Sequence, residues 1–108
     1  LEALVRSVEG SRLVRDISPL PPGKTLKSLI TGVQERGGSV VARLDRGHVC
    51  PFAGRPHGSN GAVLAAEVGG FSVRYTCLSG KCREARGGTA SADVVAPPID
   101  WTTPAPIP

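Results

Sequence analysis

Cys50-Pro-Phe-Ala-Gly-Arg-Pro-His57 and Cys77-Leu-Ser-Gly-Lys-Cys82 are the two stretches of the sequence that decide its organisation. Together they contain all three cysteines of the chain and one of its two histidines. Zinc takes four thiolate or imidazole ligands in a tetrahedron, and structural sites commonly draw them from two short loops. Gly80 in the second stretch allows the backbone to curl beneath a metal. The spacing favours a zinc site made by the three cysteines and one histidine.

The identity of the histidine is left open by spacing alone. His48 lies two residues before Cys50, and in a strand the two side chains would face the same side, whereas His57 lies in the loop after it. Two interpretations compete with a metal site: a disulfide from Cys50 to Cys77 or Cys82, or three small buried hydrophobic residues. An odd number of cysteines cannot pair completely within one chain, which favours an intracellular, reducing setting.

The residues between the two stretches predict a β-hairpin that would bring them together. Residues 62–68 and 71–76 have the composition and alternation of two strands, and Gly69-Gly70 is a favoured hairpin turn. Residues 39–44 predict another strand, which leads towards Cys50. We therefore expect an α+β fold: a small module with one or two N-terminal helices and a zinc-stapled β-hairpin.

Helical spacing dominates the N-terminal part of the sequence. Apolar residues within 1–8 and within 25–36 recur every three or four positions, which predicts two helices. Gly37-Gly38 is expected to end the second helix in the left-handed cap position. Between the helices, residues 12–17 predict a short strand, and the prolines of residues 18–23 predict a loop.

The composition divides the chain into three parts. Residues 1–38 are expected to form a helical packing extension, residues 39–90 the zinc-binding β-hairpin domain, and residues 91–108 a Pro-rich linker or tail. The chain has no Met, which indicates a piece of a longer protein, and aromatic residues make up only 4% of it, so a thin core would gain from a metal staple. No stretch has the length of a transmembrane helix, and no membrane partner is expected.

Basic residues gather around the cysteines. Residues 43–86 hold seven Lys and Arg against three Asp and Glu, whereas the rest of the chain holds six of each. This excess would attract phosphate, although a solvated arginine-rich surface explains it equally well. Two-metal nucleotidyl transfer needs clustered carboxylates, and the aspartates of this chain include no closely spaced pair. We therefore expect no enzyme activity from this stretch alone.

The two stretches also fit a longer pattern: a cysteine, six residues, a histidine, any residue, Ser-Asn, a strand pair, and two cysteines separated by four residues. In this sequence its members are Cys50, His57, Ser59-Asn60, Cys77 and Cys82. The pattern resembles the zinc-binding motif of herpesvirus primase subunits and of eukaryotic primase-polymerases, in the archaeo-eukaryotic primase family. The resemblance covers about a third of the chain and selects His57 over His48. The sequence departs from the family at residues 78–81, which lack its usual acidic residue and proline, and in its few hairpin aromatics.

The resemblance implies an accessory zinc domain of a DNA primase or primase-polymerase. In that family the catalytic carboxylates belong to a separate primase catalytic domain, and the zinc domain helps to hold the initiating nucleotide or the primer 5′ phosphates. The implied partners are template or primer nucleic acid, a nucleoside triphosphate, and a primase catalytic domain upstream or in a partner. Phosphate contacts of this kind need cationic side chains near the metal loops. The candidates by position are Arg46, Arg55, Lys81 and Arg83.

A different class of function stays open: a structural zinc knuckle that serves only protein–protein contact. Phosphate-facing Arg and Lys favour nucleic acid, whereas binding that ignores salt would favour protein contact, because phosphate contacts release counterions. If the family motif applies, loss of His57 is expected to abolish metal binding, whereas loss of His48 is expected to have a mild effect.

Overall fold

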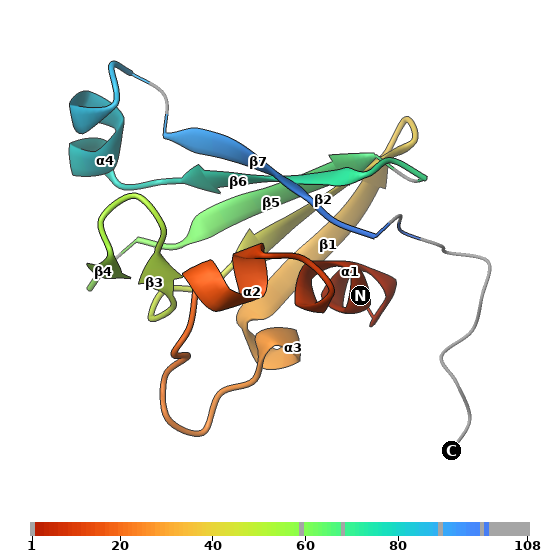
Figure 1. The fold of residues 1–108 in the computed structure, drawn as a ribbon, viewed down its shortest axis with the longest axis horizontal. Coiled ribbons are helices and arrows are strands. Elements are labelled where there is room, and N and C mark those ends of the chain that lie inside the picture. The colour runs from red at the N-terminus through yellow and green to blue at the C-terminus, as the bar shows by residue number, and fades with distance from the viewer. Residues whose placement is uncertain (1, 59, 68, 89, 98, 100–108) are drawn as a thin grey trace.

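A five-stranded antiparallel sheet carries the structure, and the predicted hairpin lies within it (Figure 1). The computed structural model describes residues 2–58, 60–67, 69–88, 90–97 and 99. The strands of the sheet follow the order β1-β2-β5-β6-β7. Their bounds are Ile30–Arg36 for β1, Ser39–Leu44 for β2, Ala62–Glu67 for β5, Ser72–Cys77 for β6 and Ser91–Val95 for β7.

Strands β5 and β6 confirm the predicted hairpin and place it at the middle of the sheet. Along both strands, side chains on one face are buried and those on the other are more exposed, because successive residues point to opposite faces. Ala62 at the start of β5 pairs with Cys77 at the end of β6. The open end of the hairpin therefore carries Cys77. The chain that leads from Cys50 and His57 enters β5 beside it.

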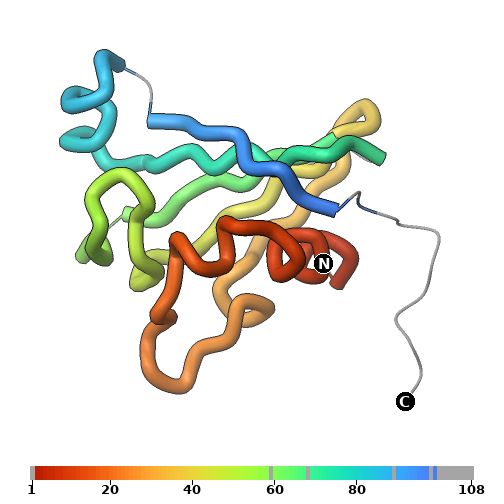
Figure 2. The backbone as a smooth tube through the Cα atoms, in the orientation of Figure 1, coloured from red at the N-terminus to blue at the C-terminus, as the bar shows by residue number. Residues whose placement is uncertain are grey.

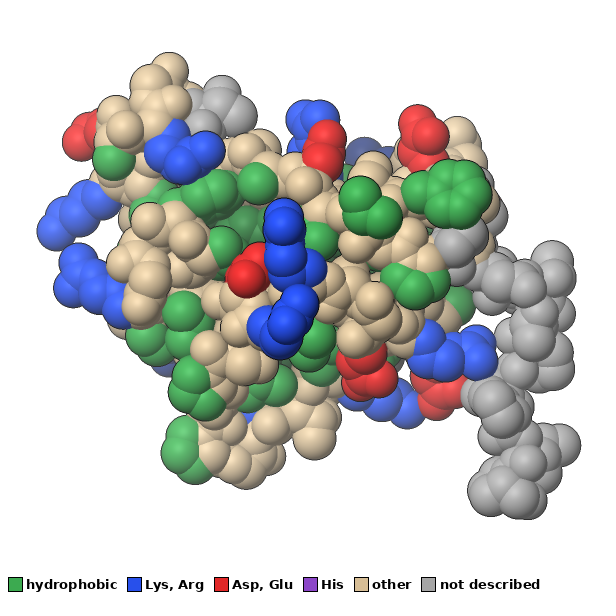
Figure 3. All heavy atoms as spheres, in the orientation of Figure 1, with side chains coloured by type: hydrophobic (Ala, Val, Ile, Leu, Met, Phe, Trp, Pro, Cys, Tyr) green, Lys and Arg blue, Asp and Glu red, His purple; other side chains and the backbone are tan. Residues whose placement is uncertain are grey.

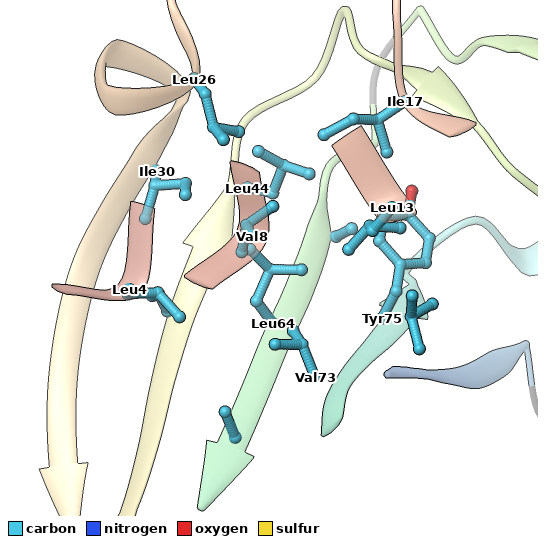
Figure 4. Close-up of a cluster of buried hydrophobic side chains, with 14 of the residues drawn as sticks. Leu4, Val8, Leu13, Ile17, Leu26, Ile30, Leu44, Leu64, Val73 and Tyr75 are labelled. Carbon is cyan, nitrogen blue, oxygen red and sulfur yellow. The ribbon is translucent and has the colours of Figure 1, made fainter. Parts of the chain in front are cut away.

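Three short helices cover the buried face of this sheet and confirm the α+β class (Figure 1). They are α1 (Glu2–Glu9), α2 (Leu13–Asp16) and α3 (Leu26–Leu29). Val8 and Leu13 point towards the strands, where Leu64 and Tyr75 face them (Figure 4). Burying one such aliphatic side chain stabilises a fold by roughly 1.5–3 kcal/mol, so these contacts hold the helices in place. No helix in the described part of the chain is long and apolar enough to span a membrane.

The predicted helix over residues 25–36 is wrong beyond its first turn. The Thr25 hydroxyl accepts the N–H of Ser28 and begins α3, but the helix ends at Leu29 and the chain continues as β1, paired with β2. The β-branched residues at 30, 31 and 33 fit a strand once β2 offers an edge for pairing. Gly37-Gly38 has φ angles of 55° and 85° and makes the two-residue turn of that hairpin rather than a helix cap.

The predicted strand over residues 12–17 is also wrong, because this segment contains α2. Leu13 and Ile17 are both buried and lie four residues apart, which is helical spacing. The hydroxyl of Ser11 accepts the N–H of Leu13 at 3.2 Å, just before the helix starts. The loop predicted for residues 18–23 is confirmed, since no helix or strand occurs there.

The predicted tail over residues 91–108 begins too early. Ser91–Val95 form strand β7, which pairs with β6, and Arg74 and Asp93 make an ion pair across the two strands at 3.0 Å. The Ser7 hydroxyl of α1 then donates a hydrogen bond to the carbonyl of Pro97 at 2.6 Å and ties the following chain to the first helix. Residues 100–108 of the predicted tail lie outside the described residues, as does Ser59 of the motif.

A second, two-stranded sheet and a fourth helix occupy one end of the structure (Figure 2). The strands are β3 (Val49–Cys50) and β4 (Arg55–Pro56), and the helix is α4 (Gly80–Ala85). These elements lie near the end of the large sheet where β5 begins and β6 ends (Figure 1). The two cysteine stretches, which are separated by the whole hairpin in sequence, therefore meet in space.

Gly61, directly before β5, lies close to the backbone of Leu44 at the end of β2. A Cβ atom at Gly61 would lie 2.4 Å from the carbonyl oxygen of Leu44, which is backbone and cannot rotate away. We expect Gly61→Ala to destabilise the fold by about 1–3 kcal/mol, as overpacking does, with a matching fall in Tm. Gly58→Ala is the control, because a Cβ there meets nothing within 4 Å. Equal Tm values for the two variants would contradict this close approach.

Candidate metal centre

Four side chains converge on one point at the end of the large sheet. The ligand atoms of Cys50, His57, Cys77 and Cys82 all lie within 4.8 Å of one another. The Sγ atom of Cys50 lies 3.7 Å from that of Cys77 and 3.9 Å from that of Cys82. The Nε2 atom of His57 lies 3.4 Å from the Sγ of Cys77 and 3.3 Å from the Sγ of Cys82. This cluster could hold a metal ion.

The small sheet positions the first two members of the cluster. Cys50 in β3 pairs with Arg55 in β4, and the N–H of Gly54 donates to the carbonyl of Cys50 at 2.8 Å, which closes the turn between the strands. His57 follows β4 directly, so the tight turn returns the chain to the side of Cys50. Arg46 Nη1 donates to the carbonyl of Gly58 at 3.2 Å and braces the same loop. The loop thus delivers a thiol and an imidazole to one place.

The end of β6 and the start of α4 position the other two members. Cys77 is the last residue of β6, and its N–H donates to the carbonyl of Ala90 at 2.8 Å. The N–H of Ser79 donates to the Sγ of Cys77 at 3.4 Å, so the turn folds back over the sulfur. Cys82 lies in the first turn of α4, which begins at Gly80. Both sulfurs therefore point at the same spot from a strand and a helix.

The three buried thiols are not joined by disulfides, so all three sulfurs are available as metal ligands. Cys50, Cys77 and Cys82 are free, and the sulfur separations exceed the roughly 2.05 Å of a disulfide. Burial raises the pKa of the Cys77 thiol to about 12, and the adjacent Cys50 thiol adds to the rise. Thiolates are the form in which cysteine binds a metal, and a cation at this point supplies the charge that lets them ionise together.

His48 is not part of the cluster, because both of its ring nitrogens have other partners. Nδ1 donates to the backbone carbonyl of Asp45 at 2.7 Å, and Nε2 accepts from the hydroxyl of Tyr75. A carbonyl oxygen can only accept, which assigns the ring proton to Nδ1. Burial lowers the pKa of His48, which favours the neutral ring. His48 is buried, and both of its ring nitrogens are hydrogen-bonded. The sequence predicts a mild effect for its loss, but with these contacts we expect its loss to destabilise the fold.

Two of the four predicted phosphate-binding residues lie beside the cluster. Arg55 and Lys81 line a hollow of about 590 Å³ together with His57. Glu84 lines it too and offsets part of the positive charge. The other residues around this hollow are Pro56, Gly58, Asn60, Ser79 and Gly80. We call this space the phosphate hollow, because it is lined by two of the four residues predicted to bind phosphate.

The other two predicted residues do not line this hollow. Arg46 is engaged with the carbonyl of Gly58 and braces the first loop rather than facing the phosphate hollow. Arg83 is an exposed residue of α4 and is not among the residues that line the hollow. The structure therefore places Arg55 and Lys81 in the lining of the hollow, Arg46 in contact with Gly58 of that lining, and Arg83 outside it.

Sequence reasoning missed Phe52 and Arg86, which meet beside the same cluster. The Cζ atom of Arg86 lies 4.4 Å from the centroid of the Phe52 ring. The available signal was an aromatic residue inside a metal-binding loop, two positions after Cys50. Their contact joins the first loop to the end of α4, so no local pattern in the sequence contains both.

Comparison with known proteins adds no neighbour to this geometry. No protein-family model, curated protein or solved structure matches the chain. What the site can do follows from its own side chains. Three thiols and an imidazole are arranged to bind a cation, and two basic side chains stand next to the imidazole.

The two histidines are expected to separate metal binding from core stability. His57→Ala removes one of four ligand atoms and should lower bound metal well below one equivalent. His48→Ala should keep the metal but destabilise the fold by about 1–3 kcal/mol, because the buried Tyr75 hydroxyl loses its acceptor. Metal analysis of the purified variants and their Tm values in saturating metal check both effects. Metal lost from His48→Ala and kept by His57→Ala would contradict the assignment.

Proposed function

We propose that the chain is a zinc-binding accessory domain that contacts nucleic acid and nucleotide phosphates during primer synthesis by a primase or primase-polymerase. The observation that carries this proposal is the shared wall between the metal cluster and the phosphate hollow. His57 belongs to both, with Arg55 and Lys81 beside it. A metal bound to His57 would therefore also hold one wall of the phosphate hollow, where Arg55 and Lys81 lie.

The ligand distances support zinc as the metal. With Zn–S bonds of about 2.3 Å and a Zn–N bond of about 2.0 Å, a tetrahedron has S–S edges of about 3.8 Å and S–N edges of about 3.5 Å. Two of the three S–S separations here are 3.7 and 3.9 Å, two of the three S–N separations are 3.4 and 3.3 Å, and all ligand atoms lie within 4.8 Å of one another. Thiolate ligands also select zinc over magnesium or calcium, which take oxygen.

The surface charge around the cluster supports a phosphate-bearing ligand. A divalent ion with three thiolates and a neutral imidazole has a net charge of about −1, so attraction for phosphate has to come from the surrounding side chains. Basic side chains project from the end of the molecule that carries β4 and α4, on the left in Figure 3. In the phosphate hollow, Arg55 and Lys81 outnumber Glu84. Arg and Lys at such a place position phosphate without reading base sequence.

The order of ligands along the fold supports the primase context. The sequence motif that resembles the primase zinc domain requires a strand pair between its two halves, and β5 and β6 are that pair. In this proposal the catalytic carboxylates come from a separate primase catalytic domain. The accessory domain adds grip on phosphates at the step where the catalytic domain has almost no duplex to hold.

A structural zinc knuckle for protein contact is the second candidate. Phe71 and Val95 favour it, since their side chains are 70% and 81% exposed. Exposed large apolar residues in a cluster mark contact surfaces in many proteins. These two residues lie on the large sheet and its turn rather than in the phosphate hollow, so a protein contact there would not use the cations beside His57.

Lys81→Gln separates the two candidates. The variant removes one cation from the phosphate hollow, so we expect weaker binding of a 5′-triphosphorylated single strand. The slope of log affinity against log salt should fall by about one unit for the lost phosphate contact. Lys24→Gln is the matched control, because Lys24 lies in the loop before α3 and is not among the residues lining the hollow. Binding is measured by fluorescence anisotropy at several salt concentrations.

The same pair of variants tests the primase context in the complete enzyme. Lys81→Gln should slow formation of the first dinucleotide more than extension of a pre-made primer, because extension already has a duplex to grip. Equal losses in both reactions would point to general destabilisation. An unchanged salt slope, with nucleic-acid binding retained, would contradict the phosphate contact and favour the protein-contact candidate.

A further inference from the structure

A second hollow adjoins the phosphate hollow, and the two share a wall. It has a volume of about 210 Å³ and is lined in part by Arg55, His57 and Lys81, the same three side chains that border the phosphate hollow. The rest of its lining differs in character, because apolar and aromatic surface replaces the polar backbone of the first. Those remaining residues are Phe52, Ala53, Cys82, Ala85 and Arg86. Both hollows thus contain Arg55 and Lys81, and the second adds the apolar side chains of Phe52, Ala53 and Ala85.

Phe52 and Arg86 form a cation–π pair in the lining of this second hollow. The guanidinium carbon of Arg86 lies 4.4 Å from the centre of the Phe52 ring. The edge of Phe52 also packs against Tyr75, with ring centroids 5.8 Å apart and planes at 60°. Phe52 therefore contacts both Tyr75 and Arg86, and Phe52 and Arg86 both line the second hollow. Aromatic rings and guanidinium planes are the two protein surfaces on which unpaired bases stack.

The cluster residues hold both members of the pair. Phe52 lies in the turn that the Gly54 N–H closes onto the carbonyl of Cys50, and the N–H of Arg86 donates to the carbonyl of Cys82 at 3.1 Å. The pair is therefore assembled from both sides of the metal cluster.

We propose that the Phe52–Arg86 pair is the base-stacking platform of a nucleoside triphosphate site. The base lies on the pair in the second hollow, and the phosphates lie at Arg55 and Lys81 across the shared wall. This inference rests on the proposed function, because it uses the same phosphate contacts, and it adds the recognition of the nucleoside. A stacking surface accepts every base, since each has a π face, which suits a site that must hold whichever nucleotide begins the strand.

The test compares ATP with inorganic tripolyphosphate on the zinc-loaded chain by isothermal titration calorimetry, with zinc content measured after each titration. A site that recognises only phosphate binds tripolyphosphate at least as tightly, because it carries the phosphate charge in full. Stacking of the base should instead make ATP bind roughly tenfold more tightly. Equal affinities, or tighter binding of tripolyphosphate, would overturn the stacking platform while leaving the phosphate contacts in place. Failure of both compounds to bind would overturn the phosphate contacts as well.

Two conservative variants assign the effect to the pair. Arg86→Lys keeps the charge but loses the flat guanidinium, and Phe52→Leu keeps apolar volume but loses the aromatic ring. Each should reduce the affinity for ATP towards that for tripolyphosphate, with tripolyphosphate binding, zinc content and Tm close to those of the unaltered chain. If Phe52→Leu lowers the Tm, Arg86→Lys carries the test, because Arg86 is exposed and outside the core. An undiminished preference for ATP in Arg86→Lys would overturn the platform.

Discussion

Three buried thiols and one imidazole share a single point, and the elements around that point depend on it for their positions. The strands β3 and β4 have two residues each, and α4 has six. Elements this short are marginal on their own. Cys77 belongs to the large sheet, Cys50 to the small sheet and Cys82 to α4, so one cation would bind all three elements together. The free energy of metal binding then becomes free energy of folding for this end of the molecule.

The same dependence links the metal to the surface that would meet a ligand. Phe52 and Arg55 lie between Cys50 and His57, whereas Lys81 precedes Cys82 directly. Each of these residues lies in a segment that also contains a cluster residue. The positions of these side chains in the two hollows therefore depend on the position of the cluster. A structural metal can in this way prepare a binding surface without touching the ligand. In the proposed function the attraction for phosphate would come from Arg55 and Lys81, because a zinc ion bound by three thiolates would have no net positive charge left to offer.

The sequence predicts the central hairpin and the three cysteine ligands, because the hairpin and each cysteine stretch are local patterns, whereas only the family resemblance selects His57 over His48. The edge strands could not be predicted in the same way. Residues 25–33 satisfy helical spacing, and only the edge offered by β2 draws Ile30 and its followers into β1. Ser91–Val95 likewise become a strand because β6 has a free edge. The pairs His48–Tyr75 and Phe52–Arg86 join residues far apart in the chain, so their contacts exist only once the sheet has formed. His48 is an example: strand spacing allows its side chain to face the cluster, but its Nε2 atom accepts a hydrogen bond from the buried Tyr75 hydroxyl instead.

The proposed function depends most on whether Cys50, His57, Cys77 and Cys82 bind one metal ion together. Zinc K-edge X-ray absorption of the zinc-loaded chain measures the coordination of the metal directly. A cluster of Cys50, His57, Cys77 and Cys82 gives three sulfur neighbours at about 2.3 Å and one nitrogen neighbour at about 2.0 Å. Zinc surrounded mainly by oxygen or nitrogen, or by fewer than three sulfurs, would contradict the cluster as the site that organises this end of the fold.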